Sequence, residues 1–231
     1  MNKPEIKKPF FVFNPKSYIY GEKLLELIEL SEELAIKNEI TIFVTTPFAD
    51  IQNASDNTQR VIVTAQHMDS LKPGRGMGYV LPESISSAGA RAVFLNHAEH
   101  PMTVSDLTKT LKRAKELELI TIVCADSILE AKAIAMLDPD VILCEPTELI
   151  GTGQTSSEDY IRETNESIKN VNPNICVMQA AGISSSDDVY RTISLGADGT
   201  GATSGIIESE EPKKTLEEMI VAATKAAREM N

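Results

Sequence analysis

The regular alternation of short apolar runs with helix-like stretches is the feature that most constrains the fold. Runs rich in β-forming residues recur at 10–13, 40–45, 61–65, 92–95, 120–124, 141–145, 175–179 and, more weakly, 197–202. Most are followed by a stretch with helical periodicity, as in 21–38, where Leu24, Leu27 and Ile28 share one face. Strands that alternate with helices pair in parallel, because each crossover returns the chain to the same end of the sheet.

Two architectures have this alternation: an open doubly wound sheet and a closed barrel. An open dinucleotide-binding sheet carries Gly-x-Gly-x-x-Gly after its first strand, and no such motif follows residues 10–13. Eight units in 231 residues are typical of the closed form, which takes about 250 residues. No linker or shift of composition divides the chain. We therefore predict an α/β fold with a single (β/α)8 barrel domain over residues 1–231, in which units two and three have the weakest helical pattern.

Composition excludes several classes of function. The net charge of −12 disfavours a general nucleic-acid binder, which needs a basic face. No apolar run reaches the ~18 residues of a membrane span, and no signal-peptide pattern follows "MNKPEIKKPF". The cysteines, Cys124, Cys144 and Cys176, are odd in number and lie in apolar runs, which predicts reduced core thiols. We expect a cytoplasmic protein without nucleic-acid or membrane partners.

Polar residues gather where the predicted strands end, which is where a parallel barrel builds its site. They are Asn14, Lys16, Gln66, His67, Asn96, His97, Glu99, Glu145, Gly182, Thr203, Ser204 and Gly205. Most have an ordinary explanation taken singly, as solvated charges or helix caps. Glu145 is harder to explain in that way, because burying a carboxylate at the end of an apolar strand is costly. Their convergence on one rim predicts a functional site.

Several of these segments resemble the triosephosphate isomerase family, especially its short archaeal-type sequences. The likeness covers nearly the whole chain. The segments "NPKSY" (14–18), "LNHAEH" (95–100) and "EPTELIGTG" (145–153) are similar to the family's Asn-x-Lys, His-Ser-Glu and glutamate-plus-lid segments. The last of these is the most specific. The stretches 65–83 and 181–189 look like the family's interface loop and one of its phosphate loops.

The resemblance implies an aldose-ketose isomerase that interconverts dihydroxyacetone phosphate and D-glyceraldehyde 3-phosphate through an enediol(ate), with no cofactor and no metal. It implies that Glu145 is the base and that His97 polarises the carbonyl. Lys16 would offset negative charge on the substrate, and Asn14 would hold Lys16 or the substrate. Residues 147–149 would form the tip of a lid, and glycines at 151–153 its far hinge.

The phosphate site and the assembly are also implied by the resemblance. Backbone N–H groups would bind the phosphate, which explains how an acidic chain could hold a dianion. These groups belong to Gly151, Gly182, Thr203 and Ser204. The interface loop implies a homodimer or a homotetramer, with Met77 near a neighbour's active site.

The chain departs from the family pattern at several positions, which are Met77, Ala98, Gln179, Ala180 and Gly201. Gly201 matters most, because the family usually has a leucine there, beside the glutamate. Losing it removes ~2–3 kcal/mol of apolar contact, at ~0.8 kcal/mol per methylene. If the space is open, a four-carbon phosphate could fit. If Met178 fills it, the enzyme should be strict for trioses.

Two alternative functions stay open. The first is a related isomerase acting on a larger sugar phosphate, such as a tetrulose phosphate, and Gly201 favours it. The second is a catalytically silent sugar-phosphate-binding protein. The presence of Asn14, Lys16, His97 and Glu145 together counts against the second. An unrelated barrel enzyme would share the phosphate loops but would lack "EPTELIGTG".

Overall fold

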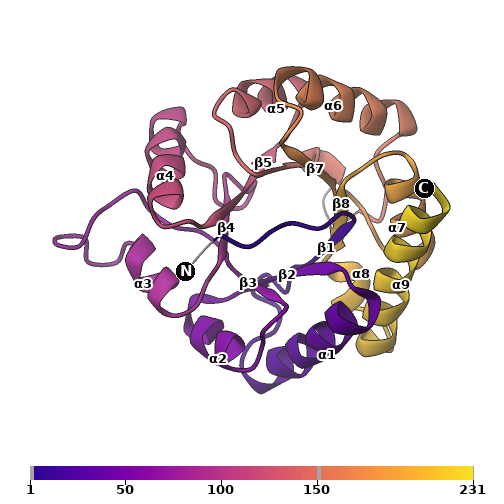
Figure 1. Ribbon diagram of the computed structural model, residues 1–231, viewed down its shortest axis with the longest axis horizontal. Coiled ribbons are helices and arrows are strands. Elements are labelled where there is room, and N and C mark those ends of the chain that lie inside the picture. Colours follow the sequence, from indigo (N-terminus) through magenta and orange to yellow (C-terminus); the bar gives the residue numbers. More distant parts are fainter. Residues whose placement is uncertain (1–2, 150–151, 231) are drawn as a thin grey trace.

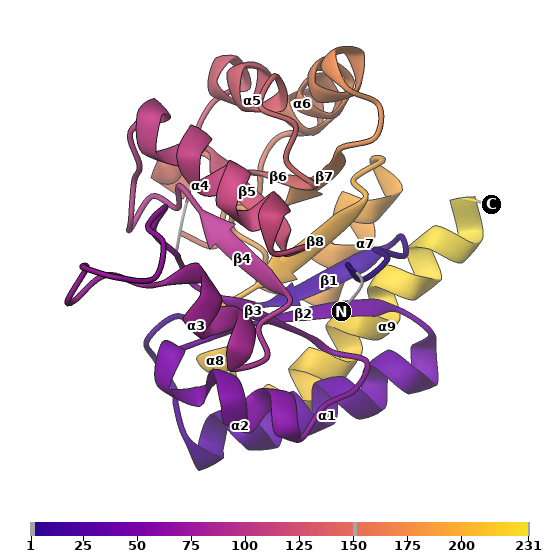
Figure 2. The same cartoon turned by 60° about the vertical axis from the view of Figure 1, so that its left-hand side comes forward.

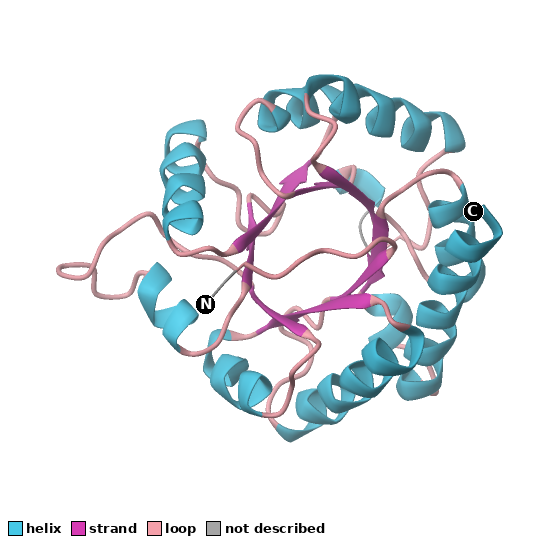
Figure 3. Cartoon of the chain, viewed as in Figure 1, coloured by secondary structure: helices cyan, strands magenta, loops and turns pink. Residues whose placement is uncertain are grey.

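A closed barrel of eight parallel strands forms the centre of the molecule, with helices around it (Figures 1 and 3). The computed structural model describes residues 3–149 and 152–230. The strands follow one another around the ring in chain order, and β1 pairs with β8 to close it. The predicted (β/α)8 barrel is therefore confirmed, and the open sheet is excluded.

The strands are short, and every residue in them is buried. They are β1 Phe10–Phe13, β2 Thr41–Thr46, β3 Ile62–Ala65, β4 Ala92–Leu95, β5 Ile120–Ala125, β6 Val141–Cys144, β7 Cys176–Gln179 and β8 Gly199–Ala202. Burial on both faces explains their nearly continuous apolar sequences.

The helices pack on the outer face of the barrel. They are α1 Glu22–Asn38, α2 Ile51–Asp56, α3 Pro82–Ser87, α4 Val104–Glu116, α5 Ile128–Ala135, α6 Glu158–Val171, α7 Ser186–Ser194, α8 Ser204–Ile207 and α9 Pro212–Met230, with short 3₁₀ turns at Phe48–Asp50 and Thr147–Leu149. Several begin at a serine or threonine whose side chain accepts a backbone N–H, as Ser185 does at α7. None of the helices within the described residues is long and apolar enough to span a membrane.

Alternate residues of strands β1 to β7 enter two separate cores. One set lies inside the barrel and includes Phe10 and Phe43, whose rings meet edge to face with centroids 5.6 Å apart. The other set packs between the strands and the helices, and Leu24 and Ile28 of α1 belong to it. This alternation follows from the two-residue period of a strand. It fixes which side chains can reach the mouth of the barrel.

The second and third strand–helix units show little helical periodicity in the sequence because their helices are short. Helices α2 and α3 have only six residues each, which is too short for a clear helical period. Most of unit three is instead a loop between β3 and α3, which projects from the barrel (Figure 2). The weak helical periodicity of these two units is thus due to their short helices. The predicted number of eight strands is confirmed.

Six of the predicted strands differ from the observed ones by one or two residues at an end, and one of these differences bears on the site. Residues 141–145 were expected to form a strand that ends at Glu145, but β6 ends at Cys144. The N–H of Glu145 still donates to the carbonyl of Ala125, at 3.0 Å. The backbone of Glu145 is therefore anchored to β5, while its side chain stands just beyond the strand.

The N-terminal segment crosses the amino end of the barrel before it enters β1 (Figure 3). The ammonium of Lys3 lies 2.6 Å from the carboxylate of Asp140, and that of Lys8 lies 2.7 Å from Asp198. Since Asp140 precedes β6 and Asp198 precedes β8, the segment ties distant strands together at the end opposite the strand C-termini.

Candidate active site

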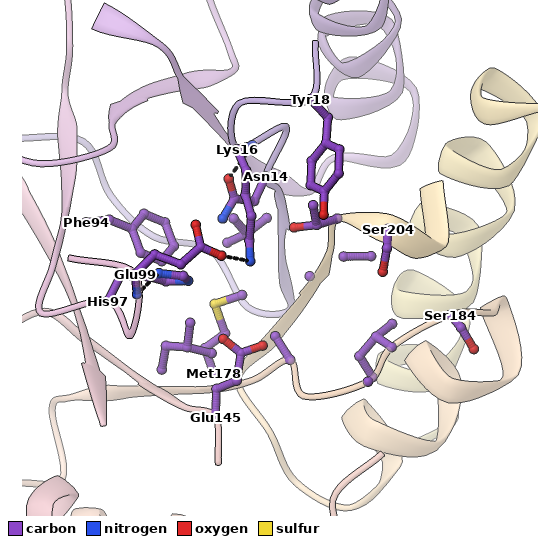
Figure 4. Close-up of a pocket in the computed structure, with 18 of the residues that line it drawn as sticks. Asn14, Lys16, Tyr18, Phe94, His97, Glu99, Glu145, Met178, Ser184 and Ser204 are labelled. Atoms are coloured by element: carbon purple, nitrogen blue, oxygen red, sulfur yellow. Dashed lines mark hydrogen bonds and ion pairs between the residues drawn. The ribbon is translucent and has the colours of Figure 1, made fainter. Parts of the chain in front are cut away.

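A cavity of about 280 Å³ opens at the carboxyl end of the strands (Figure 4). Of the predicted site residues, those that line it are Asn14, Lys16, His97, Glu145, Gly182, Thr203 and Ser204. They come from five different loops and meet only because the barrel closes. Gly151 lies outside the described residues. Gly153, on the same loop, lines the cavity.

Lys16 is held by its own loop after β1. Its backbone is left-handed, with φ +46°, which is uncommon for a residue with a side chain. Asn14 supports this turn, because its Oδ1 accepts the N–H of Lys16 at 2.9 Å, and the side chain of Gln66 donates to the carbonyl of Lys16 at 2.7 Å. The Lys16 ammonium lies 2.5 Å from the carboxylate of Glu99. The lysine is thereby directed into the cavity.

The loop after β4 is fixed by Asn96, which also has a left-handed backbone, with φ +58°. Its side-chain amide donates to the carbonyl of Cys124 and to Glu130, both at 3.0 Å. Its Oδ1 accepts the N–H of Met102 at 3.0 Å. Asn96 thus positions the histidine that follows it.

His97 presents a specific tautomer to the cavity. The backbone N–H of Glu99 donates to Nδ1 of His97 at 3.1 Å, so in the neutral ring the proton is on Nε2. Burial lowers the pKa of His97, and the positive charge of Lys16 lowers it further. A neutral imidazole with an Nε2–H can donate a hydrogen bond to a carbonyl oxygen.

The pKa of Glu145 is shifted in the opposite direction to that of His97. Burial raises the pKa of its carboxyl group to about 6, opposed by Lys16 and assisted by Glu99. An acid with such a pKa is poised both to accept and to return a proton near neutral pH. Figure 4 shows Glu145 and His97 in the same cavity, with Lys16 also directed into it.

The loops after β7 and β8 pack tightly enough to require glycine. Gly182 has φ +65°, and a Cβ atom there would overlap the backbone of Gln154. A Cβ atom at Gly205 would lie 2.7 Å from the Cα of Ser184. Backbone therefore lies directly against backbone around Gly182, Thr203 and Ser204, and brings main-chain groups to the cavity.

The space expected at Gly201 is already occupied. A Cβ atom there would overlap the carbonyl oxygen of Val12 and lie 2.8 Å from Cε of Met178. Of the two alternatives for Gly201, the structure therefore matches the one in which Met178 takes the place of a β8 side chain.

Gly201→Leu should consequently destabilise the barrel. Overpacking of a close-packed core typically costs about 1–3 kcal/mol, and here the obstacle is the backbone of Val12. Chemical denaturation of the variant and the wild type would measure the loss. Equal free energies of unfolding would contradict the tight packing at Gly201. Ala133→Leu is a suitable control, because Ala133 is an exposed position of α5 with ordinary helical backbone.

Two of the other departures, Gln179 and Ala180, lie next to each other at the end of β7. Gln179 points away from the cavity, is only 2% exposed, and its amide donates to Oγ1 of Thr164 on α6 at 2.7 Å. Ala180 lines the cavity.

The cavity residues that the sequence did not single out include Tyr18, Phe94, Ser184 and Glu208. Tyr18 could have been found, because it belongs to "NPKSY". Glu208 could not, since nothing in its segment distinguishes it from the many other acidic residues.

A second, smaller cavity lies beside the first and shares Asn14, Lys16, His97 and Glu99 with it. His67 and His100 also line it, with their rings stacked and their centroids 3.9 Å apart. Its volume is about 220 Å³. Across residues 3–149 and 152–230, no group of three or more His, Cys, Asp or Glu side chains has a metal-binding arrangement.

Comparisons with known proteins agree with this geometry. The model of the family described as "Triosephosphate isomerase" matches residues 9–223. The triosephosphate isomerase of Methanobacterium bryantii is 37% identical over 222 residues, covering 94% of this chain and 98% of that protein. The enzyme of Sulfurisphaera tokodaii is 37% identical, covering 96% and 98%, and that of Methanothermus fervidus 36%, covering 92% and 98%. The chain therefore belongs to the triosephosphate isomerase family.

Proposed function

We propose that this chain is a triosephosphate isomerase, which interconverts dihydroxyacetone phosphate and D-glyceraldehyde 3-phosphate. Family membership supports the reaction class. The observation that carries the proposal is the opposed pair of perturbations in one cavity, a carboxyl group with its pKa raised to about 6 and a histidine with its pKa lowered. This pair suits removal of a proton beside a carbonyl group without an added cofactor.

In the proposed mechanism the Glu145 carboxylate removes a proton from C1 of dihydroxyacetone phosphate. The electron pair of the C–H bond forms the C1–C2 double bond, and the C2 carbonyl becomes an enediolate oxygen. Nε2–H of His97 donates to that oxygen and then assists transfer of the hydroxyl proton from O1 to O2. Glu145 returns its proton to C2, which gives the aldehyde and regenerates the carboxylate.

Lys16 supplies the positive charge that the enediolate and the phosphate need. Its ammonium is paired with Glu99, whose side chain is 61% exposed. A substrate dianion can compete with so exposed a carboxylate, since water screens an exposed ion pair. Asn14 holds the backbone turn that directs Lys16 inwards.

The phosphate is proposed to bind backbone N–H groups from the loops after β7 and β8, at Gly182, Thr203 and Ser204. Gly151 is proposed as a further donor from the loop after β6. This proposed phosphate site is supported by the close backbone packing around Gly182 and Gly205, which leaves main-chain groups at the cavity surface. Successive backbone N–H groups can form an anion site without a basic patch.

A coupled assay with purified protein would test the function. Glyceraldehyde 3-phosphate and erythrose 4-phosphate should be compared side by side over the same concentrations. We expect turnover of the triose phosphate to dominate. Absence of triose isomerisation, with binding of phosphate compounds retained, would support a silent binding protein instead. Faster turnover of erythrose 4-phosphate would support the larger-substrate isomerase.

The acid side of the pH profile should include the ionisation of Glu145, together with that of the substrate phosphate, whose second pKa is also about 6. Only the ionised carboxylate can accept a proton, so kcat/KM should fall below pH ~6. His97 should add no second limb above that pH, because its pKa is lowered and its ring is already neutral. The measurement is kcat/KM from pH 4.5 to 9, within the range over which the wild type stays folded. A neutral-range limb that disappears in His97→Gln would contradict a neutral histidine.

We further propose a homodimer, alone or as half of a homotetramer, in a reducing compartment such as the cytoplasm. The loop between β3 and α3 is closed at its base, where Asp69 and Val80 exchange backbone and side-chain hydrogen bonds of 2.9 and 2.7 Å. At its tip Met77 is fully exposed and Tyr79 is 66% exposed. The second cavity of a neighbour would accept this tip. The three buried free thiols favour the compartment.

Met77→Glu should therefore weaken the assembly and lower the activity together. A carboxylate buried against the acidic rim that Glu99 provides would be strongly disfavoured. Multi-angle light scattering at micromolar concentration, run beside the assay, measures both effects. Met230→Glu, at an exposed methionine near the C-terminus, is the matched control. A fully active wild-type monomer would overturn the proposed assembly.

A further inference from the structure

Strand β8 presents no side chains to the interior of the barrel, because its two inward positions are Gly199 and Gly201. Neighbouring strands fill the space. At the lower level the ring of Phe10 occupies the volume where a Cβ atom of Gly199 would lie. At the upper level Cε of Met178 lies 2.8 Å from the corresponding position at Gly201. One wall of the cavity is thus built from a long side chain of β7.

Met178 is placed to contact whatever occupies the cavity. It is 2% exposed, it lines the cavity, and it belongs to the core inside the barrel. On the side of β6 it is in register with Leu143, which lies two residues before Glu145. Figure 4 shows its thioether on the same side of the cavity as Glu145. The side chain of Met178 therefore lies between β8, which has no inward side chains, and the carboxylate of Glu145.

We propose that Met178 is the residue that limits substrate length at this site, by filling the volume beside Glu145 that β8 leaves empty. This inference rests on the proposed isomerase function and adds a determinant of its specificity. A four-carbon sugar phosphate has one hydroxymethyl group more than a triose phosphate. With the phosphate held at the loops after β7 and β8, the extra group would have to enter the volume that Met178 occupies.

The limit on substrate length should change with the volume of the side chain at position 178. The side chain is unbranched, so it can follow the irregular gap above Gly201. Shortening it to alanine removes Cγ, Sδ and Cε, which is at least the volume of a hydroxymethyl group. One methylene group in an apolar pocket changes discrimination by about 10–200-fold. Leucine at this position would keep most of the volume, since leucine and methionine exchange with little cost.

The test compares three variants with the wild type, using glyceraldehyde 3-phosphate and erythrose 4-phosphate. Met178→Ala should raise the ratio of kcat/KM for the tetrose phosphate over the triose phosphate by at least ~10-fold. Met178→Leu should restore a ratio close to that of the wild type. Val177→Ala is the matched control, because Val177 is equally buried on β7 but faces the helices. It should loosen the strand without changing the ratio.

A second readout separates specificity from general damage. If Met178 excludes water from Glu145, its truncation should shift the acid limb of kcat/KM to lower pH, because a better-hydrated carboxylate ionises more easily. Met178→Leu should leave the limb in place.

The possible failures are distinguishable. A wild-type enzyme that isomerises the triose phosphate, with a Met178→Ala variant that loses activity on both substrates equally and keeps its pH limb, would overturn the role of Met178 alone. A folded wild type inactive on the triose phosphate would remove the proposed function and this inference together. If Met178→Ala does not fold, Met178→Val provides the same comparison with a smaller change of volume. An unchanged substrate ratio in that variant would also reject the proposal.

Discussion

Glu145→Gln is expected to lower kcat by about 10²–10⁴-fold, the range for loss of a general acid–base group. The upper end is expected here, because one carboxylate both removes and returns the proton in the proposed mechanism. The fold should survive, since the amide keeps the shape of the side chain. Steady-state kinetics, with circular dichroism to verify folding, would measure this. A variant that retains more than roughly a tenth of the wild-type kcat would show that Glu145 is not the base.

The same substitution should stabilise the protein at alkaline pH. The pKa of Glu145 is about 6 in the folded chain against 4.5 for an ordinary glutamate, so ionisation of the buried group costs folding free energy above pH 6. That cost is on the order of 1–2 kcal/mol at pH 8. It should vanish below pH 4.5, where both states are protonated. Glu118→Gln, at the opposite end of the barrel, should show neither effect. A gain that persists at low pH would point to packing rather than charge.

Lys16→Met is expected to lower kcat/KM by about 10²–10³-fold, comparable to removal of a donor at a developing negative charge. The thioether keeps much of the length of the lysine but carries no charge. Binding of a non-reacting phosphate ligand should weaken as well, because Lys16 faces both the enediolate and the phosphate in the proposed pose. Isothermal titration with such a ligand separates this loss from the chemical step.

The control for Lys16 is Lys23→Met, which removes one positive charge from the surface near α1 and not from the cavity. It should leave kcat/KM within about twofold, since surface charges are strongly screened at physiological salt. If both variants lose activity equally, net charge rather than position would be responsible. If Lys16→Met binds the ligand normally, its charge would act only on the enediolate.

The order of the strands could be predicted from the sequence because the strands and most of the helices have their own local patterns. Leu24, Leu27 and Ile28 predicted α1 by spacing alone, and all three are buried. The ends of the strands also placed Lys16, His97 and Glu145 on one rim, since parallel strands share a carboxyl end. The resemblance to a known family then gave these residues distinct roles.

Features that depend on packing between distant segments could not be predicted. The state of Gly201 depends on Val12 and Met178, which lie on the two neighbouring strands of the sheet. Glu208 reaches the cavity only because α8 ends beside it. The neutral form of His97 depends on a backbone N–H two residues away and on burial by other loops. Periodicity carries no information about such contacts.

The closure of β1 onto β8 has a consequence for how the chain is made. Phe10 pairs with Gly199, so β1 lacks its second partner until β8 has left the ribosome. The ion pairs of Lys3 with Asp140 and of Lys8 with Asp198 likewise form only after the two aspartates have been synthesised. During synthesis the nascent chain therefore exposes an apolar strand edge, "FFVF", for as long as elongation lasts. Such an edge is available for pairing with other chains during synthesis, and co-translational chaperones are suited to shielding it.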